Sequence, residues 1–166
     1  MLKLGEILRA PKASIKIGGW RTGKVPASAF PLKKAGKLPQ SPAWQWRIVE
    51  FEAMKRQFVL LIRLNVEVEY YSSILAMRND QLIQVICHHE FHSSHRSWHC
   101  HFVAGNVEET FPGVLRDYDR MRVFDAKPSE SGKLDFNVQL EDALGIASAR
   151  FRFDAPDETP VQALLL

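Results

Sequence analysis

Four segments between residues 44 and 91 have the side-chain pattern of β-strands, and the short connections between them strongly constrain the fold. Residues 44–53 alternate large apolar and polar side chains, which is typical of a half-buried strand. Residues 58–65 are almost all apolar and fit a central strand. Residues 70–77 fit a strand or a helical turn, and the turn signal Arg-Asn-Asp separates them from residues 81–91. Such short connections join antiparallel neighbours, so the sequence predicts a meander.

The C-terminal third is less regular and predicts both helices and strands. Pro112–Arg122 fits a short helix, and Leu134–Leu140 fits a strand. Residues 141–148 have the composition of a helix, whereas Phe151 and Phe153 alternate with charged residues as a strand would. We therefore expect an α+β fold: an antiparallel β-sheet of about five strands in a meander, with one or two covering helices.

The N-terminal part of the chain differs in composition from the rest. Five prolines and four glycines lie between residues 10 and 43, which predicts an irregular N-terminal arm over residues 1–42. Within it, Ala-Ser-Ile-Lys-Ile at residues 13–17 fits one short strand. The remaining chain, residues 43–166, is expected to form a single α+β domain, because its length suits one hydrophobic core.

The basic excess of the chain also lies in this arm. The first 40 residues hold nine Lys and Arg side chains against one acidic side chain, Glu6. Such an arm could bind a nucleic acid or a protein partner, or it could be a solvated tail that folds against the acidic C-terminal part. No apolar run approaches the roughly 20 residues that span a bilayer, and no continuous apolar signal sequence begins the chain. We therefore expect a cytoplasmic protein without membrane contact.

The side chains that most favour chemistry are concentrated in one short segment. All six histidines and both cysteines fall between Cys87 and His101. Imidazole and thiolate are common ligands of transition metals, and imidazole is the usual acid/base group near neutral pH. This segment is therefore the predicted functional site.

Strand alternation divides this cluster between two faces of a predicted hairpin, with strands over 82–91 and 98–104. If Phe91 lies opposite Trp98, then Glu90 lies opposite His99 and His88 opposite His101. The predicted metal ligands are His88, His99 and His101, and Glu90 is the predicted catalytic base or a residue that orients a ligand. The metal would be zinc or another divalent transition metal. The side chains expected on the opposite, core-facing side are Cys87, His89 and Cys100.

One run within the hairpin has a known counterpart. His99-Cys100-His101-Phe102-Val103 resembles the His-hydrophobic-His motif of the relaxase and replication-initiator endonucleases. The resemblance implies that His99 and His101 bind a divalent metal, completed by His88 or Glu90. It also implies that Tyr118 attacks a DNA phosphate and that the basic arm contacts DNA. The match covers five residues, with Cys100 in place of a larger apolar residue, and we do not assign the chain to that family.

Two functions are consistent with these residues. The first is a metal-dependent hydrolase or nuclease, with Glu90 as general base. The alternative is a non-catalytic interaction or regulatory module, in which the histidine cluster is structural and the basic arm contacts nucleic acid or a protein. The sequence contains no phosphate-binding glycine loop, dinucleotide fingerprint, His-Glu-x-x-His or Gly-x-Ser-x-Gly motif, so it predicts none of the enzyme classes that these motifs mark.

Overall fold

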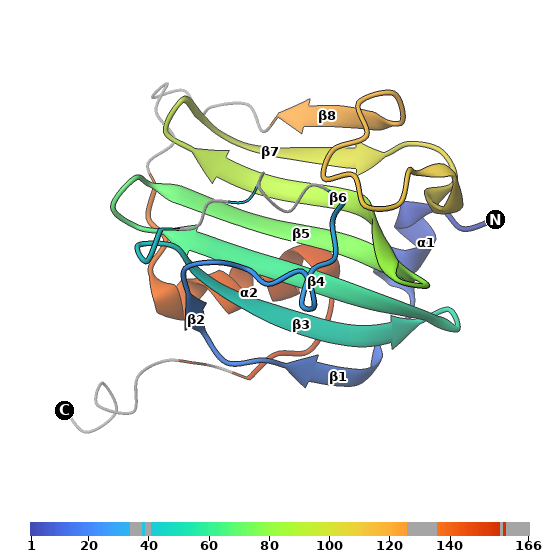
Figure 1. Cartoon of the computed structure of the whole chain (residues 1–166), viewed down its shortest axis with the longest axis horizontal. Coiled ribbons are helices and arrows are strands. Elements are labelled where there is room, and N and C mark those ends of the chain that lie inside the picture. Colours follow the sequence, from blue (N-terminus) through green and yellow to red (C-terminus); the bar gives the residue numbers. More distant parts are fainter. Residues whose placement is uncertain (34–37, 39–40, 126–135, 157, 159–166) are drawn as a thin grey trace.

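The protein is mostly β: eight strands form one antiparallel sheet (Figure 1). The structure is a computed structural model that describes residues 1–33, 38, 41–125, 136–156 and 158. The strand order is β1-β3-β4-β5-β6-β7-β8, and the short β2 also pairs with β3. The expected antiparallel sheet is confirmed, but the expected number of about five strands is too low.

The elements follow the chain in a simple order. They are α1 (Leu4–Arg9), β1 (Ala13–Ile17), β2 (Arg21–Thr22), β3 (Gln45–Ala53), β4 (Arg56–Asn65), β5 (Tyr70–Asn79), β6 (Leu82–His92), β7 (His95–Val103), the 3-10 helix η2 (Val107–Glu109), β8 (Met121–Asp125) and α2 (Leu140–Phe151). The predicted meander corresponds to β3 to β6, each paired with the next. The turn between β5 and β6 contains Asp80 at a φ of 48°, a conformation that Asp tolerates better than most residues.

The segment predicted as a helix over Pro112–Arg122 is instead a loop that leads into β8. This loop is fastened to β6, because the Gly113 amide donates to the Ile83 carbonyl over 2.7 Å. Gly113 has a φ of +76°, and a Cβ there would lie 2.6 Å from Lys33 Cγ. A φ of this sign is incompatible with a right-handed helix at Gly113.

The predictions for the C-terminal part are partly wrong. The expected helix over 141–148 is confirmed as the centre of α2. The predicted strand over 134–140 is absent from its described part, 136–140, and residues 134–135 lie outside the described residues. Phe151 ends α2 and Phe153 follows it, and both rings are buried. They reach the core from a helix end because Arg152 between them has a φ of 57°.

The N-terminal segment is more ordered than its proline and glycine content predicted. The expected strand over 13–17 is confirmed as β1, and α1 and β2 are additional elements. Ile7 and Phe30 from this segment are buried in the core of the sheet. Lys12 donates from Nζ to three carbonyls at the end of α1, each over 2.8 Å. At least this basic side chain therefore serves the fold.

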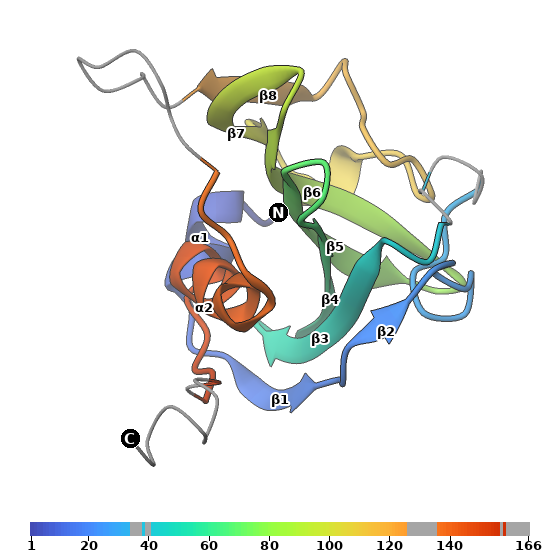
Figure 2. The ribbon, with the colours of Figure 1, turned by 90° about the vertical axis from the view of Figure 1, so that its left-hand side faces the viewer.

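The sheet is curved, and both helices lie on the same face of it (Figure 2). On that face, the Tyr71 hydroxyl donates to the carbonyl of Ala143 in α2 over 3.3 Å. The core is continuous, with β4 residues 58–62 all fully buried. Among the described residues, no helix is both long and apolar enough to cross a bilayer. The opposite face of the sheet carries the polar side chains of the candidate site.

Candidate metal centre

The histidine hairpin has the register that its apolar faces predicted. In the β6–β7 pair, His88 lies opposite His101, and Glu90 lies opposite His99. The turn is shorter than expected, since only Ser93 and Ser94 lie between the strands. A bulge between the turn and Glu90 compensates for this difference and restores the predicted pairs.

Glu90 stands in the middle of a row of paired residues that crosses six strands. Each member of the row is the pairing partner of the next, so their side chains lie on one face of the sheet. The row consists of Trp46 on β3, Arg63 on β4, Ser72 on β5, Glu90 on β6, His99 on β7 and Asp125 on β8. The sheet thus places one carboxylate between an arginine two strands away and a histidine on the next strand.

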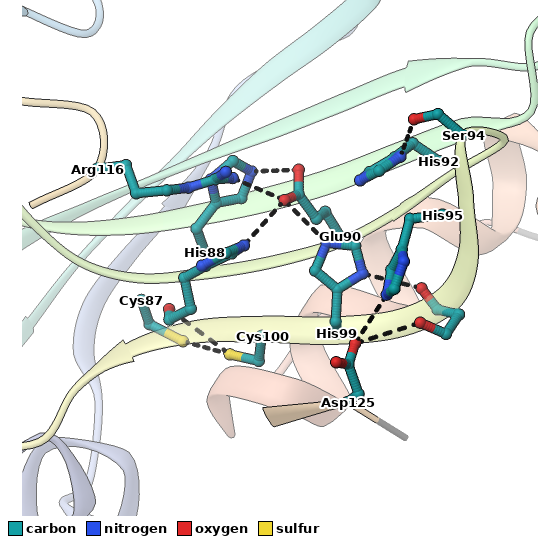
Figure 3. A network of polar contacts seen from close by, with 12 residues as sticks. Cys87, His88, Glu90, His92, Ser94, His95, His99, Cys100, Arg116 and Asp125 are labelled. Atoms are coloured by element: carbon teal, nitrogen blue, oxygen red, sulfur yellow. Dashed lines mark hydrogen bonds and ion pairs between the residues drawn. The ribbon is translucent and has the colours of Figure 1, made fainter. Parts of the chain in front are cut away.

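The Glu90 carboxylate is the hub of the polar network (Figure 3). Its side chain is only 5% exposed. Arg116 donates from Nη2 to Glu90 Oε1 over 2.6 Å. The Nε2 atoms of His99 and His101 lie 3.1 and 3.4 Å from the same oxygen. The Tyr70 hydroxyl donates to the other oxygen, Oε2, over 3.3 Å.

Hydrogen bonds to the far side of each ring indicate which nitrogen carries the proton. His99 Nδ1 lies 3.0 Å from the Ser97 carbonyl, which can only accept, so this nitrogen is protonated. In the neutral ring, the lone pair of His99 Nε2 therefore faces the Glu90 carboxylate. His88 is the reverse case, because its Nδ1 accepts from Arg116 over 3.2 Å and its Nε2 must carry the proton.

The His99–Glu90 contact therefore requires a proton or a metal ion between the two facing atoms. Two lone pairs that face each other over 3.1 Å repel unless a proton or a metal ion lies between them. For a tetrahedral zinc ion with bonds of about 2.0–2.1 Å, two ligand atoms lie roughly 3.3–3.4 Å apart. The separations from Glu90 Oε1 to His99 and His101 nearly match that spacing. The donor set thus fits a transition metal.

The pKa values of the network agree with a charged carboxylate among neutral rings. Burial alone would raise the pKa of Glu90, but the neighbouring His88 ring and the Arg116 charge hold it well below its usual range. Burial lowers the pKa of His88 to about 4, against the opposing effect of Glu90. Burial and then the Arg116 charge lower the pKa of His101. Both shifts favour the neutral form of these rings, which keeps a lone pair for bonding.

Among the described residues, the structure brings together most of the predicted ligands, but Glu90 takes the place of His88 in the group. Potential ligand atoms of Glu90, His99 and His101 lie within 4.8 Å of one another, close enough to hold a metal ion. His88 is buried beside them but is not part of this group. Its Nε2 lies 3.1 Å from Glu90 Oε2, at an angle unsuited to a hydrogen bond.

A second group of potential ligands lies at the outer end of the hairpin. It consists of His95, His99 and Asp125, of which His95 and Asp125 are about half exposed. His95 Nε2 lies 3.0 Å from Asp125 Oδ1, and Ser97 donates to the same oxygen over 3.3 Å. His99 would have to serve both groups, and its buried Nε2 already faces Glu90. The group around Glu90 is therefore the stronger candidate.

The residues predicted to face the core lie on the helix side of the sheet. Cys87 and Cys100 are both buried, with their Sγ atoms 3.1 Å apart. The His89 ring packs against Trp98, with centroids 5.1 Å apart. Its Nδ1 has no hydrogen-bond partner in the described chain, so His89 is a packed aromatic side chain here.

A pocket opens beside Glu90 and contains residues that the sequence analysis did not select. Arg63 had a signal, because it is the single charged side chain in the apolar run 58–65. Arg116 had none, since its loop was predicted as a helix. Tyr118, the nucleophile that the endonuclease resemblance implies, is 75% exposed and lines the same pocket. The lining residues are Arg63, Tyr70, His88, Glu90, Leu115, Arg116 and Tyr118.

Comparisons of this chain with protein-family models, curated proteins and solved structures found no match. The geometry of the site is therefore the basis for a functional proposal.

Proposed function

We propose that the protein binds a divalent transition metal, zinc first, through Glu90, His99 and His101, and that it is a metal-dependent hydrolase. The observation that carries the proposal is the close grouping of three potential ligand atoms, since Glu90 Oε1 lies 3.1 and 3.4 Å from the Nε2 atoms of His99 and His101. Two imidazoles and one carboxylate are a known ligand set of catalytic zinc. A zinc ion held in this way activates water for hydrolysis near neutral pH.

The remaining side chains of the network would orient the ligands. The Ser97 carbonyl holds the His99 ring in one tautomer. Arg116 and Tyr70 bind the two oxygens of Glu90 and thereby restrain the carboxylate. Glu90 is thus proposed as a ligand, whereas the sequence analysis favoured it as a base. His88, which the sequence predicted as a ligand, lies beside the other carboxylate oxygen and is not proposed as a ligand.

The alternative function, a non-catalytic module with a structural histidine cluster, has one observation in its favour. Arg116 already supplies a positive charge at 2.6 Å from Glu90 Oε1. With a proton on His99 Nε2, the carboxylate would be balanced by protein groups alone. The pocket beside the network favours the first proposal, because a purely structural cluster needs no open space.

Metal content distinguishes the two functions. Untagged protein is analysed by mass spectrometry of its metals and then titrated with zinc by calorimetry after chelation. We expect about one equivalent of tightly bound zinc, and loss of binding in a His99→Ala/His101→Ala variant. The matched control is His92→Ala/His95→Ala, which removes two histidines of the same hairpin from outside the proposed ligand set. The metal proposal is wrong if less than about a tenth of an equivalent is present and none binds on titration.

A further inference from the structure

The pocket beside the metal centre contains a buried positive charge without a negative partner. Arg63 is only 4% exposed, yet no carboxylate in the described part of the chain lies within 4 Å of its guanidinium. Its hydrogen bonds go to neutral hydroxyls instead: Nε donates to Ser72 over 3.1 Å and Nη2 to Tyr70 over 2.9 Å. A buried charge that lacks a counter-ion is costly, so this site favours an anion.

The charge balance of the pocket is positive even before any metal binds. Arg63 and Arg116 contribute two positive charges, and Glu90 contributes one negative charge. The sum over these three side chains is one positive charge. A divalent metal at Glu90 would raise this sum to three. In a partly buried pocket, such a charge binds a multiply charged anion better than a singly charged one.

Unused hydrogen-bond donors lie in the same pocket. Arg116 Nε is buried and has no hydrogen-bond partner in the described chain. His88 Nε2, the nitrogen that carries the proton in the neutral ring, also lacks a hydrogen bond in the described chain, although Glu90 Oε2 lies 3.1 Å away. Both residues line the pocket, together with Arg63. Guanidinium groups and N–H donors of this kind are suited to the oxygens of a phosphate group.

We propose that this pocket binds the phosphate group of a small phosphate monoester, with Arg63 and Arg116 as its charged contacts. Leu115 and Tyr118, here called the rim, also line the pocket and would contact an apolar or planar substituent. As a substrate class, this inference rests on the proposed hydrolase function. Hydrolysis would form a bond from phosphorus to the oxygen of water and break the ester bond. One water proton passes to the departing alcohol, and the other remains with inorganic phosphate.

The experiment measures binding of inorganic phosphate and phenyl phosphate to the full chain by calorimetry, in chelator and after loading with one equivalent of zinc. We expect binding in both states, with phenyl phosphate favoured because of the rim. Arg63→Gln should weaken it at least tenfold. Arg63→Lys keeps the charge but loses the planar fork, so it should weaken binding less. The control is Arg122→Gln, which removes the same charge from the opposite face of the sheet.

The outcomes separate this inference from the metal proposal. Phosphate binding to metal-free protein that depends on Arg63 supports the pocket even if no metal binds. Zinc binding that is unchanged in Arg63→Gln, together with lost phosphate binding, supports both. The inference is overturned if neither ligand binds in either state, or if Arg63→Gln and Arg63→Lys bind like the unmodified protein. Binding of acetate as tight as that of phosphate also overturns it. Circular dichroism of each variant verifies that it is folded.

Discussion

Glu90→Gln is the substitution that tests the network most directly, because it removes one negative charge and changes little in shape. The Glu90 carboxylate is 5% exposed and accepts from Arg116 at Oε1 and from Tyr70 at Oε2. A glutamine has a single acceptor oxygen, so its amide group must face one of these two donors. The variant therefore loses a charge pair and leaves one buried donor without an acceptor.

The expected loss of stability in the chelated protein is about 3 kcal/mol. Removal of one partner from a buried ion pair costs about 3–5 kcal/mol. The Arg116 side chain is 23% exposed, and water can solvate part of its charge, which places the value at the lower end of that range. Domains of this kind are typically stable by about 5–15 kcal/mol, so the variant should still fold. Its melting temperature should fall by roughly 6–12 °C.

Urea unfolding at pH 7 with chelator present measures this loss. The control is Glu67→Gln, an identical change at an exposed carboxylate in the turn between β4 and β5. We expect the control to stay within about 0.5 kcal/mol of the unmodified protein. If Glu90→Gln loses less than about 1 kcal/mol, Glu90 does not hold the positive groups together and the description of the network is wrong.

Three further predictions concern stability. Because burial lowers the pKa of His88 to about 4, His88 is protonated in the unfolded chain but still neutral in the folded chain between about pH 6.5 and 4. The free energy of unfolding of the chelated protein should therefore fall by about 3 kcal/mol between pH 6.5 and 4, and by less in His88→Gln. Urea unfolding at several pH values measures both, and an equal pH dependence of the two proteins would contradict this prediction. Phe58→Ala removes a fully buried ring that stacks on Phe51 and should cost about 3–5 kcal/mol in urea unfolding, against under 0.5 for the exposed Val68→Ala. Arg152→Gly relieves a left-handed conformation and should leave the melting temperature unchanged or higher, and a fall of several degrees would contradict the assigned geometry.

The part of the site within the hairpin could be predicted because residues of the hairpin itself determine how its two strands pair. Apolar side chains at Phe91 and Trp98 set the pairing of β6 with β7, and alternation then placed Glu90 and His99 on one face. The rings of Phe91 and Trp98 do pack together, with centroids 5.5 Å apart. A hairpin register that buries one face is strongly specified by sequence, since a one-residue slip would expose that face.

The link from Glu90 to Arg63 could not be predicted, because it depends on a bulge. Val85 pairs with Ala76, but Cys87 pairs with Leu75, so Ile86 is an extra residue in β6. Val85 and Cys87 therefore lie on opposite faces, where unbroken alternation had placed them on the same one. Counted from the Asn79–Leu82 pair without a bulge, Ser72 would lie opposite His89. The extra residue brings Glu90 there instead.

The proposed metal site and the proposed phosphate pocket are built on different parts of the fold, and this affects how their ligands would influence each other. Glu90 and His99 project from central strands whose hydrogen bonds fix their spacing, and rigid elements of this kind suit metal ligands. Arg116 belongs to the loop before β8, which Gln84 fastens by donating to the Thr110 carbonyl over 2.7 Å. Arg116 touches both parts, since it binds Glu90 and lines the pocket. An anion that binds Arg116 and a metal that binds Glu90 would act on two directly bonded side chains, so each ligand should change the affinity for the other by the same factor.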